Sequence, residues 1–133
     1  MPYINPASAY HNQAVQTANG PQLLLMLCDR LAADLARGEA AIEAADYEAG
    51  NENLQHAQSI LRMLRSALNP DGFTGGHELM AVYAFLERQL IEANLEKNVE
   101  RVRQCAELFQ PIHDAWRAAV SANEGNNAGS NLG

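Results

Sequence analysis

Four segments of this 133-residue chain carry apolar residues at intervals of three and four, and this periodicity constrains the fold more than any other feature. Such spacing places the apolar side chains on one face of an α-helix. The segments are residues 21–45, 47–68, 77–97 and 99–121. No stretch shows the sustained alternation of apolar and polar residues that is typical of a strand. The sequence therefore predicts an all-α protein.

The connections between the segments are short, which limits how the helices can be arranged. Asp46 and Asn98 each separate two segments, and both residue types are good N-caps. Residues 69–76, NPDGFTGG, form the strongest loop signal in the chain. Because short connections force neighbouring helices to be antiparallel, we predict an up-down four-helix bundle. Pro111 should kink or locally unwind the last helix, since proline removes one backbone hydrogen bond.

The remaining parts of the chain flank the bundle. Residues 1–20 are predicted to form an N-terminal lid segment with a short helix packed across the bundle, which itself spans 21–121. Pro2 and Pro6 prevent a regular helix from starting cleanly before Ala7. Residues 122–133 are rich in Asn and Gly and are predicted to be a disordered tail.

Composition and charge exclude several classes of function. The net charge of −7 argues against nucleic-acid binding, which needs clustered Lys and Arg. No apolar run approaches the roughly 20 residues that span a bilayer, and the N-terminus lacks the basic start and apolar run of a secretory signal. We therefore expect a cytoplasmic protein without membrane insertion. Cys28 and Cys105 lie within apolar helical patterns, so both are expected to be buried free thiols.

Signals for catalysis or metal binding are weak. The chain has no inward-facing Glu-x-x-His pairs of the kind that bind di-iron centres in helical bundles. It also lacks the nucleophile-elbow, P-loop and dinucleotide glycine patterns. The four histidines fall in four different segments. We therefore expect no catalytic residues, no metal and no cofactor.

The first long helix is apolar on two faces. One stripe contains Leu24, Leu27, Leu31, Leu35, Ile42 and Ala45. The other, on nearly the opposite side, contains Met26, Ala33, Ala36, Ala40 and Ala44. Alanine is the best helix former and costs little when exposed, which explains the second stripe without any partner. Alternatively, its small side chains form a shallow groove for a partner's amphipathic helix. A helical wheel does not decide which stripe faces inward.

The N-terminal segment fits the second alternative. Ile4, Tyr10 and Val15 are large apolar residues on a piece of chain too short to form a stable helix alone. Packing on the bundle would order them and cover part of its apolar surface. The other interpretation is a frayed terminus whose aromatic residues are incidental.

The order of several short motifs resembles the flagellin export chaperones of the FliS family. Tyr10, Val15, Thr17-Ala18, Pro21, Leu23 and Met26-Leu27 resemble its N-terminal signature. Asn53-Leu54, Ala57, Leu64 and Leu68 are similar to its second long helix. Gly75-Gly76, Glu78-Leu79, Tyr83, Leu90 and Ala93-Asn94 resemble its loop and third long helix, and Trp116 falls where the family carries a late tryptophan. The resemblance covers residues 10–119.

The chain departs from the family pattern at a few positions. Cys28 replaces an aromatic residue and Arg30 replaces a glycine. His77 is an extra residue between Gly76 and Glu78, and Pro111 interrupts the last helix. These departures bear on the exact shape of the pocket near Cys28 rather than on the bundle.

The resemblance implies a non-enzymatic chaperone that binds the C-terminal segment of newly made flagellin in the cytoplasm. Such a chaperone would prevent premature polymerisation of flagellin and deliver it to the flagellar type III export apparatus. Ile4, Tyr10 and Val15 would form a lid that moves when flagellin binds. The predicted lid-facing and client-facing residues of the first helix are Leu24, Leu27, Cys28, Ala33, Ala36 and Ala40. The sequence leaves open whether a second, regulatory protein binds. The alternative function is a self-associating helical adaptor, a homodimeric interaction module without a flagellin client.

Overall fold

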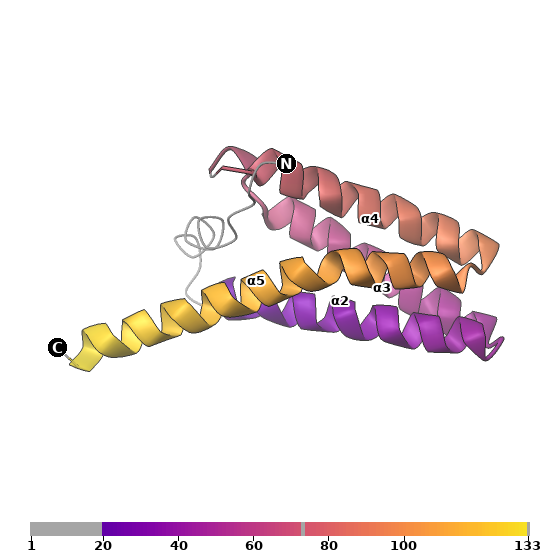
Figure 1. Ribbon diagram of the computed structural model, residues 1–133, viewed down its shortest axis with the longest axis horizontal. Coiled ribbons are helices and arrows are strands. Elements are labelled where there is room, and N and C mark those ends of the chain that lie inside the picture. Colours follow the sequence, from indigo (N-terminus) through magenta and orange to yellow (C-terminus); the bar gives the residue numbers. More distant parts are fainter. Residues whose placement is uncertain (1–19, 73, 133) are drawn as a thin grey trace.

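The computed structural model describes residues 20–72 and 74–132, with side chains described as far as Ala122. It contains four α-helices and one 3-10 turn. These are α2 (Gly20–Glu43), α3 (Tyr47–Ala67), η1 (Pro70–Gly72), α4 (Gly76–Glu96) and α5 (Val99–Leu132). No strand occurs in these residues. The predicted all-α antiparallel bundle is confirmed (Figure 1). The predicted lid helix within residues 1–20 lies outside the described residues, apart from Gly20.

The four long helices form a closed ring. Each helix packs against the next one in the chain, and α5 returns to pack against α2. The α4–α5 pair packs least extensively of the four (Figure 1). The groove described below lies at this less extensively packed seam.

The two tight turns are built in the same way. Asp46 Oδ1 accepts a hydrogen bond from Ala49 N–H at 3.3 Å, and Asn98 Oδ1 accepts one from Arg101 N–H at 3.1 Å. The residues before these caps, Ala45 and Lys97, have φ angles of 58° and 56°. A left-handed residue ends one helix, and the following cap starts the next. Both predicted N-caps are confirmed.

The loop between α3 and α4 requires glycine. Gly75 has a φ of 86°, in the left-handed region. A Cβ on Gly76 would lie only 2.1 Å from the carbonyl oxygen of Pro70. This close approach brings η1 directly against the start of α4.

The core is contributed by all four helices and consists mainly of leucines. Its fully buried large side chains are Leu31, Leu35, Leu54, Ile60, Leu61, Leu64, Leu79, Tyr83, Leu86, Leu90, Phe109 and Trp116. Gly38 is also buried, and a Cβ there would lie 2.7 Å from a Leu54 methyl carbon. The absence of a side chain at Gly38 therefore lets α3 pack closely against α2.

The last helix differs from its prediction. α5 is continuous through Pro111, which is exposed, so the helix is not unwound there. Figure 1 shows α5 curving and projecting past the other helices. The helix runs to Leu132, and the disordered tail expected for residues 122–133 stays a prediction. No proline follows Pro111, so no residue lacking a backbone N–H interrupts the helical hydrogen bonds.

Candidate functional site: apolar surfaces of the bundle

The bundle leaves several large apolar side chains exposed, and they are not spread evenly. They are Leu23, Met26, Tyr47, Met63, Phe85, Ile91, Leu95 and Leu108. Leu23 and Met26 lie on α2, and Phe85 and Leu108 line the seam between α4 and α5. Contiguous exposed apolar surface marks interaction sites more often than single exposed residues do.

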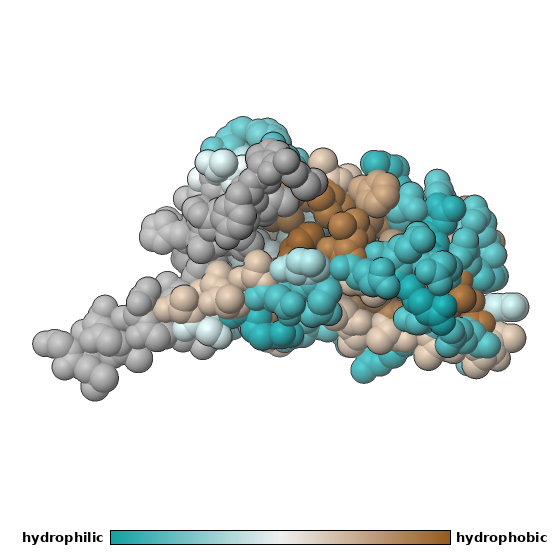
Figure 2. Space-filling model, in the orientation of Figure 1, coloured by the Kyte–Doolittle hydropathy of each residue, from teal (hydrophilic) through white to brown (hydrophobic). Residues whose placement is uncertain are grey.

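A groove of about 180 Å³ runs between α4 and α5. Its lining residues are Phe85 and Gln89 of α4 and Arg101, Gln104, Cys105 and Leu108 of α5. We call it the α4–α5 groove. Figure 2 shows a brown apolar area between these helices, bordered by polar surface. Phe85 and Leu108, on opposite sides of the groove, are 43% and 41% exposed.

Arg101 closes the groove at the end nearest the α4–α5 turn. Its guanidinium donates to Gln89 Oε1 at 3.0 Å and to Glu92 Oε2 at 2.5 Å, and it lies 3.8 Å from Glu96 Oε2. The apolar surface continues on the side away from this turn. There, the half-buried residues Val82 and Ile112 lie one helical turn from Phe85 and Leu108. The groove is therefore polar at one end and apolar along the rest.

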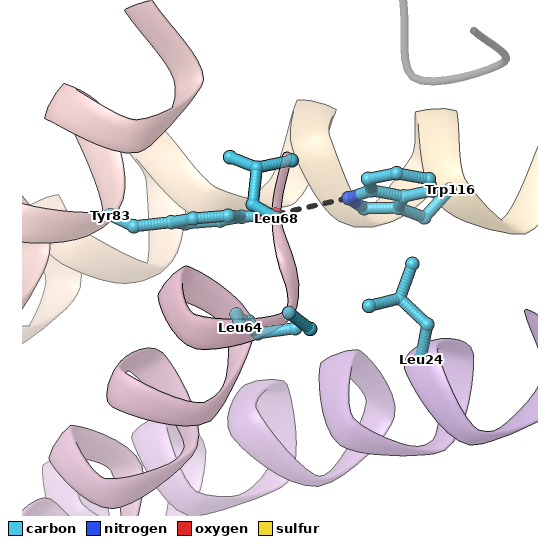
Figure 3. A pocket seen from close by; sticks show the side chains of 6 residues that line it. Leu24, Leu64, Leu68, Tyr83 and Trp116 are labelled. Carbon is cyan, nitrogen blue, oxygen red and sulfur yellow. Dashed lines mark hydrogen bonds between the residues drawn. The ribbon is translucent and has the colours of Figure 1, made fainter. Parts of the chain in front are cut away.

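A second apolar pocket lies at the end of the bundle (Figure 3). Its lining residues are Leu24, Leu64, Ala67, Leu68, Tyr83 and Trp116. Trp116 Nε1–H donates to the Tyr83 hydroxyl at 3.1 Å, and the pocket has no room for a water molecule. Burial raises the pKa of Tyr83, so its hydroxyl stays protonated. This hydrogen bond joins α4 to α5 where few other contacts do.

The outer face of α2 carries an open hollow of about 540 Å³. It is lined by Leu23, Met26, Leu27, Asp29, Arg30 and Ala33. Ala36 and Ala40 are exposed further along the same helix. This helix therefore does present apolar surface on a face other than its core face.

The structure also decides which α2 stripe faces inward. Leu24, Leu31, Leu35 and Ile42 are buried as one stripe, together with Cys28. Leu27 is half-buried and lines the outer hollow, and Ala45 is exposed in the turn. Of the residues predicted to face the lid and the client, Leu27 therefore lies at the outer hollow, whereas Leu24 and Cys28 lie in the buried stripe.

Both cysteines are free and buried, as predicted. Burial, aided by the nearby Asp29 carboxylate, raises the pKa of Cys28 to about 12. Burial raises the pKa of Cys105 to about 11, although Arg101 opposes the shift. Cys28 is fully enclosed in the core, whereas Cys105 lies at the α4–α5 groove.

Polar contacts hold α2 to both neighbours. The Asp34 carboxylate is fully buried and pairs with Arg30 Nε at 3.0 Å and with His56 Nδ1 of α3. On the other side, Asp29 Oδ1 lies 2.6 Å from His113 Nε2 of α5. The sequence did not indicate these pairs, because His56 and His113 are 22 and 84 residues away from their partners.

No cluster of His, Cys, Asp and Glu within residues 20–72 and 74–132 could hold a metal ion. His56, His77 and His113 each lie beside an aspartate instead. Across the same part of the chain, no helix is both long and apolar enough to cross a membrane. Ile4, Tyr10 and Val15, the predicted lid residues, lie outside the described residues.

Sequence reasoning missed the α4–α5 groove. The sequence did contain an indication of this groove, because Phe85 and Leu108 are large apolar residues that fall outside the apolar stripes of their helices. Only the packing of α4 against α5 shows that the two residues line one surface.

Comparison with known proteins identifies the family. The chain matches the family described as flagellar protein FliS over residues 3–123. It is 30% identical over 130 residues to the flagellar secretion chaperone FliS of Bacillus subtilis (strain 168), a match that covers 98% of the chain and 97% of the relative. It is 29% identical to the protein of the same name from Escherichia coli (strain K12), with 80% of each chain covered. The corresponding Salmonella typhimurium protein is 30% identical, with 78% of each chain covered. The chain therefore belongs to the FliS family of flagellar proteins.

Proposed function

We propose that this chain is a flagellar export chaperone that binds the C-terminal segment of newly made flagellin in the cytoplasm. In this role it keeps flagellin from polymerising before export and delivers it to the flagellar type III export apparatus. The observation that supports this most is the open apolar α4–α5 groove in a chain whose relatives are named flagellar secretion chaperones. The function requires no catalytic step.

The groove has the features of a site for an amphipathic helix. Phe85 and Leu108 offer apolar side chains from opposite walls, and Arg101 and Gln104 offer polar groups. Helix-in-groove recognition combines such an apolar stripe with polar contacts at its margins. A client segment that is disordered alone gains helix by covering this apolar surface, which offsets its loss of conformational entropy.

The exposed face of α2 is proposed as a second contact with the client or the lid. Leu27 and Ala33 line its hollow, and Ala36 and Ala40 continue it. Leu24 contributes through the pocket at the end of the bundle, and Cys28 supports the face from the core.

Ile4, Tyr10 and Val15 are proposed as a lid that covers apolar surface while no client is bound. The match to the family begins at residue 3, so it includes the segment that carries them. A lid lowers the exposed apolar area of the free protein and so opposes aggregation.

Replacing an apolar groove residue with a charged one tests the main site. Phe85→Glu and Leu108→Glu place a carboxylate where a client's apolar side chain would pack, so each should weaken binding at least about tenfold. Binding to a flagellin C-terminal peptide is measured by calorimetry. Met63→Glu, at an exposed apolar position on α3, is the matched control and should bind normally. Normal binding by a folded Phe85→Glu variant would remove the groove from the site.

The α2 surface has its own test. Ala36→Glu and Ala40→Glu lie at exposed positions, so neither should unfold the protein. If this face contacts the client, calorimetry will show weaker flagellin binding in at least one variant, and if it contacts only the lid, the loss of that competing contact will strengthen binding. Unchanged affinity in both would exclude Ala36 and Ala40 from the contact surface.

Light scattering separates the chaperone from the self-associating adaptor. A groove reserved for a client predicts mainly monomer for the free protein. A concentration-independent dimer that excludes flagellin would instead support the adaptor.

A further inference from the structure

A further apolar surface, separate from those described above, lies on α4 beside its seam with α3. Tyr47 at the start of α3 and Ile91 and Leu95 on α4 are all exposed, and Leu95 is 78% exposed, more than any other large apolar residue described. We call these three residues the α3–α4 patch.

Three contacts across the seam fix how α3 and α4 lie side by side. Glu87 lies 3.4 Å from Arg65, Asn94 Nδ2 donates to Asn51 Oδ1 at 2.7 Å, and Lys97 Nζ lies 5.7 Å from the Tyr47 ring centre. Ile91 follows Glu87 by four residues and Leu95 follows Ile91 by four more, so the two lie on a face of α4 that starts beside the seam and turns outward from it. None of the three patch residues lines the α4–α5 groove, and Glu92 and Glu96, which contact Arg101 at the end of that groove, lie between the two surfaces.

Carboxylates flank the patch on both sides at the same helical spacing. Glu48 and Glu52 are exposed on α3, one turn apart, and neither has an ion pair among the described residues. Glu92 and Glu96 are exposed on α4, also one turn apart, and share Arg101. Arg101, Lys97 and Arg88 are the nearby cations. The carboxylates therefore outnumber the cations, and the two without an ion pair in the described part of the chain, Glu48 and Glu52, lie on the α3 side.

We propose that the α3–α4 patch is a docking site for a basic amphipathic helix of a partner protein. Apolar side chains at i and i+4 of that helix would cover Ile91 and Leu95. Lysines or arginines on either side of its apolar stripe would meet Glu48 and Glu52 on one flank and Glu92 and Glu96 on the other. The charge pattern disfavours a second copy of this acidic chain, since like charges would meet.

This inference goes beyond the proposed flagellin binding and does not rest on it. The patch and the α4–α5 groove share no residue, so in this proposal both are occupied at once. The chain can therefore hold one partner while a second one docks.

A designed peptide tests the proposal directly. The probe is an 18-residue helix of leucines and lysines with all leucines on one face, added to the full-length, isotope-labelled protein at near-physiological salt. Amide chemical shifts should change around Tyr47, Asn51, Ile91 and Leu95. Changes confined to the α4–α5 groove or to the outer face of α2 would overturn the proposal.

Variants distinguish docking from simple charge attraction. Leu95→Gln should weaken peptide binding at least about fivefold, because it removes the most exposed apolar contact. Glu48→Gln with Glu52→Gln should weaken it similarly and reduce its dependence on salt. Met63→Gln should have no effect. Equal binding by a scrambled peptide of the same composition, or by Leu95→Gln, would contradict the proposal.

Flagellin binding is measured on the same variants, so that failure of one proposal is not mistaken for failure of the other. Leu95→Gln should bind the flagellin C-terminal peptide as well as the unmodified protein does. If it loses flagellin as well, the patch belongs to the client site and the separate docking site is wrong. If the unmodified protein binds the basic peptide but no flagellin, the docking proposal is supported and the chaperone proposal is contradicted.

Discussion

At the scale of single residues, the bundle depends on a few buried polar groups whose partners are distant in the sequence. The Trp116 N–H donates to the Tyr83 hydroxyl oxygen inside an apolar pocket. Asp34 is fully buried, but its partners Arg30 and His56 reach solvent. A helical pattern predicts that such positions are buried, but it carries no information about which residue on another helix pairs with them.

Tyr83→Phe tests the buried hydrogen bond. It keeps the ring that fills the pocket but leaves the Trp116 N–H without its acceptor, which costs about 1–2 kcal/mol of unfolding free energy. Urea unfolding followed by fluorescence measures this, because Trp116 is the only tryptophan in the chain. Tyr47→Phe, the same change at an exposed site, should alter stability by less than about 0.5 kcal/mol. Equal effects at the two positions would show that the Tyr83 hydroxyl contributes nothing.

The buried thiols predict how stability depends on alkaline pH. Folding raises the pKa of Cys28 from 9.0 to about 12 and that of Cys105 from 9.0 to about 11. Above pH 9 the unfolded chain releases these protons while the folded protein retains them, so stability falls as pH rises. Each thiol should remove about 1 kcal/mol of unfolding free energy by pH 10.

Urea unfolding at pH 8, 9 and 10 under reducing conditions measures that slope. The variant with Cys28→Ala and Cys105→Ala starts less stable, but its stability should change much less with pH. A slope as steep as that of the unmodified protein would assign the alkaline loss to other groups.

At the scale of elements, the sequence predicted most of the fold because its signals are local. The four helices begin and end within about two residues of the predicted boundaries, apart from the end of α5. Asp46 and Asn98 were identifiable as caps because capping depends on residues within the next turn. The α4–α5 groove was missed because it depends on how closely two helices pack, which no single helix specifies.

Asp46→Ala tests the cap that starts α3. Losing the bond to Ala49 N–H should cost about 1 kcal/mol of unfolding free energy. Asp46→Asn keeps a capping side chain and should be nearly neutral, so it is the matched control. Both are measured by urea unfolding. If Ala and Asn destabilise equally, the effect comes from the lost charge rather than from capping.

At the scale of the whole molecule, the bundle combines a well-packed core with apolar surface that it leaves open. The core holds the four helices together, and the loose α4–α5 seam leaves an apolar groove between two of them. Sequence reasoning located the excess of apolar surface on α2, where Leu23 and Met26 are indeed exposed. It did not locate the α4–α5 groove, because the facing side chains of α4 and α5 line a groove only in the folded molecule.

The most direct test is co-elution of the chain with flagellin on size-exclusion chromatography. We predict a complex with full-length monomeric flagellin and no complex with flagellin that lacks its C-terminal segment. The Phe85→Glu variant should abolish or strongly weaken the first complex, whereas Met63→Glu should leave it intact. Retained binding to the truncated flagellin would contradict the proposed mechanism.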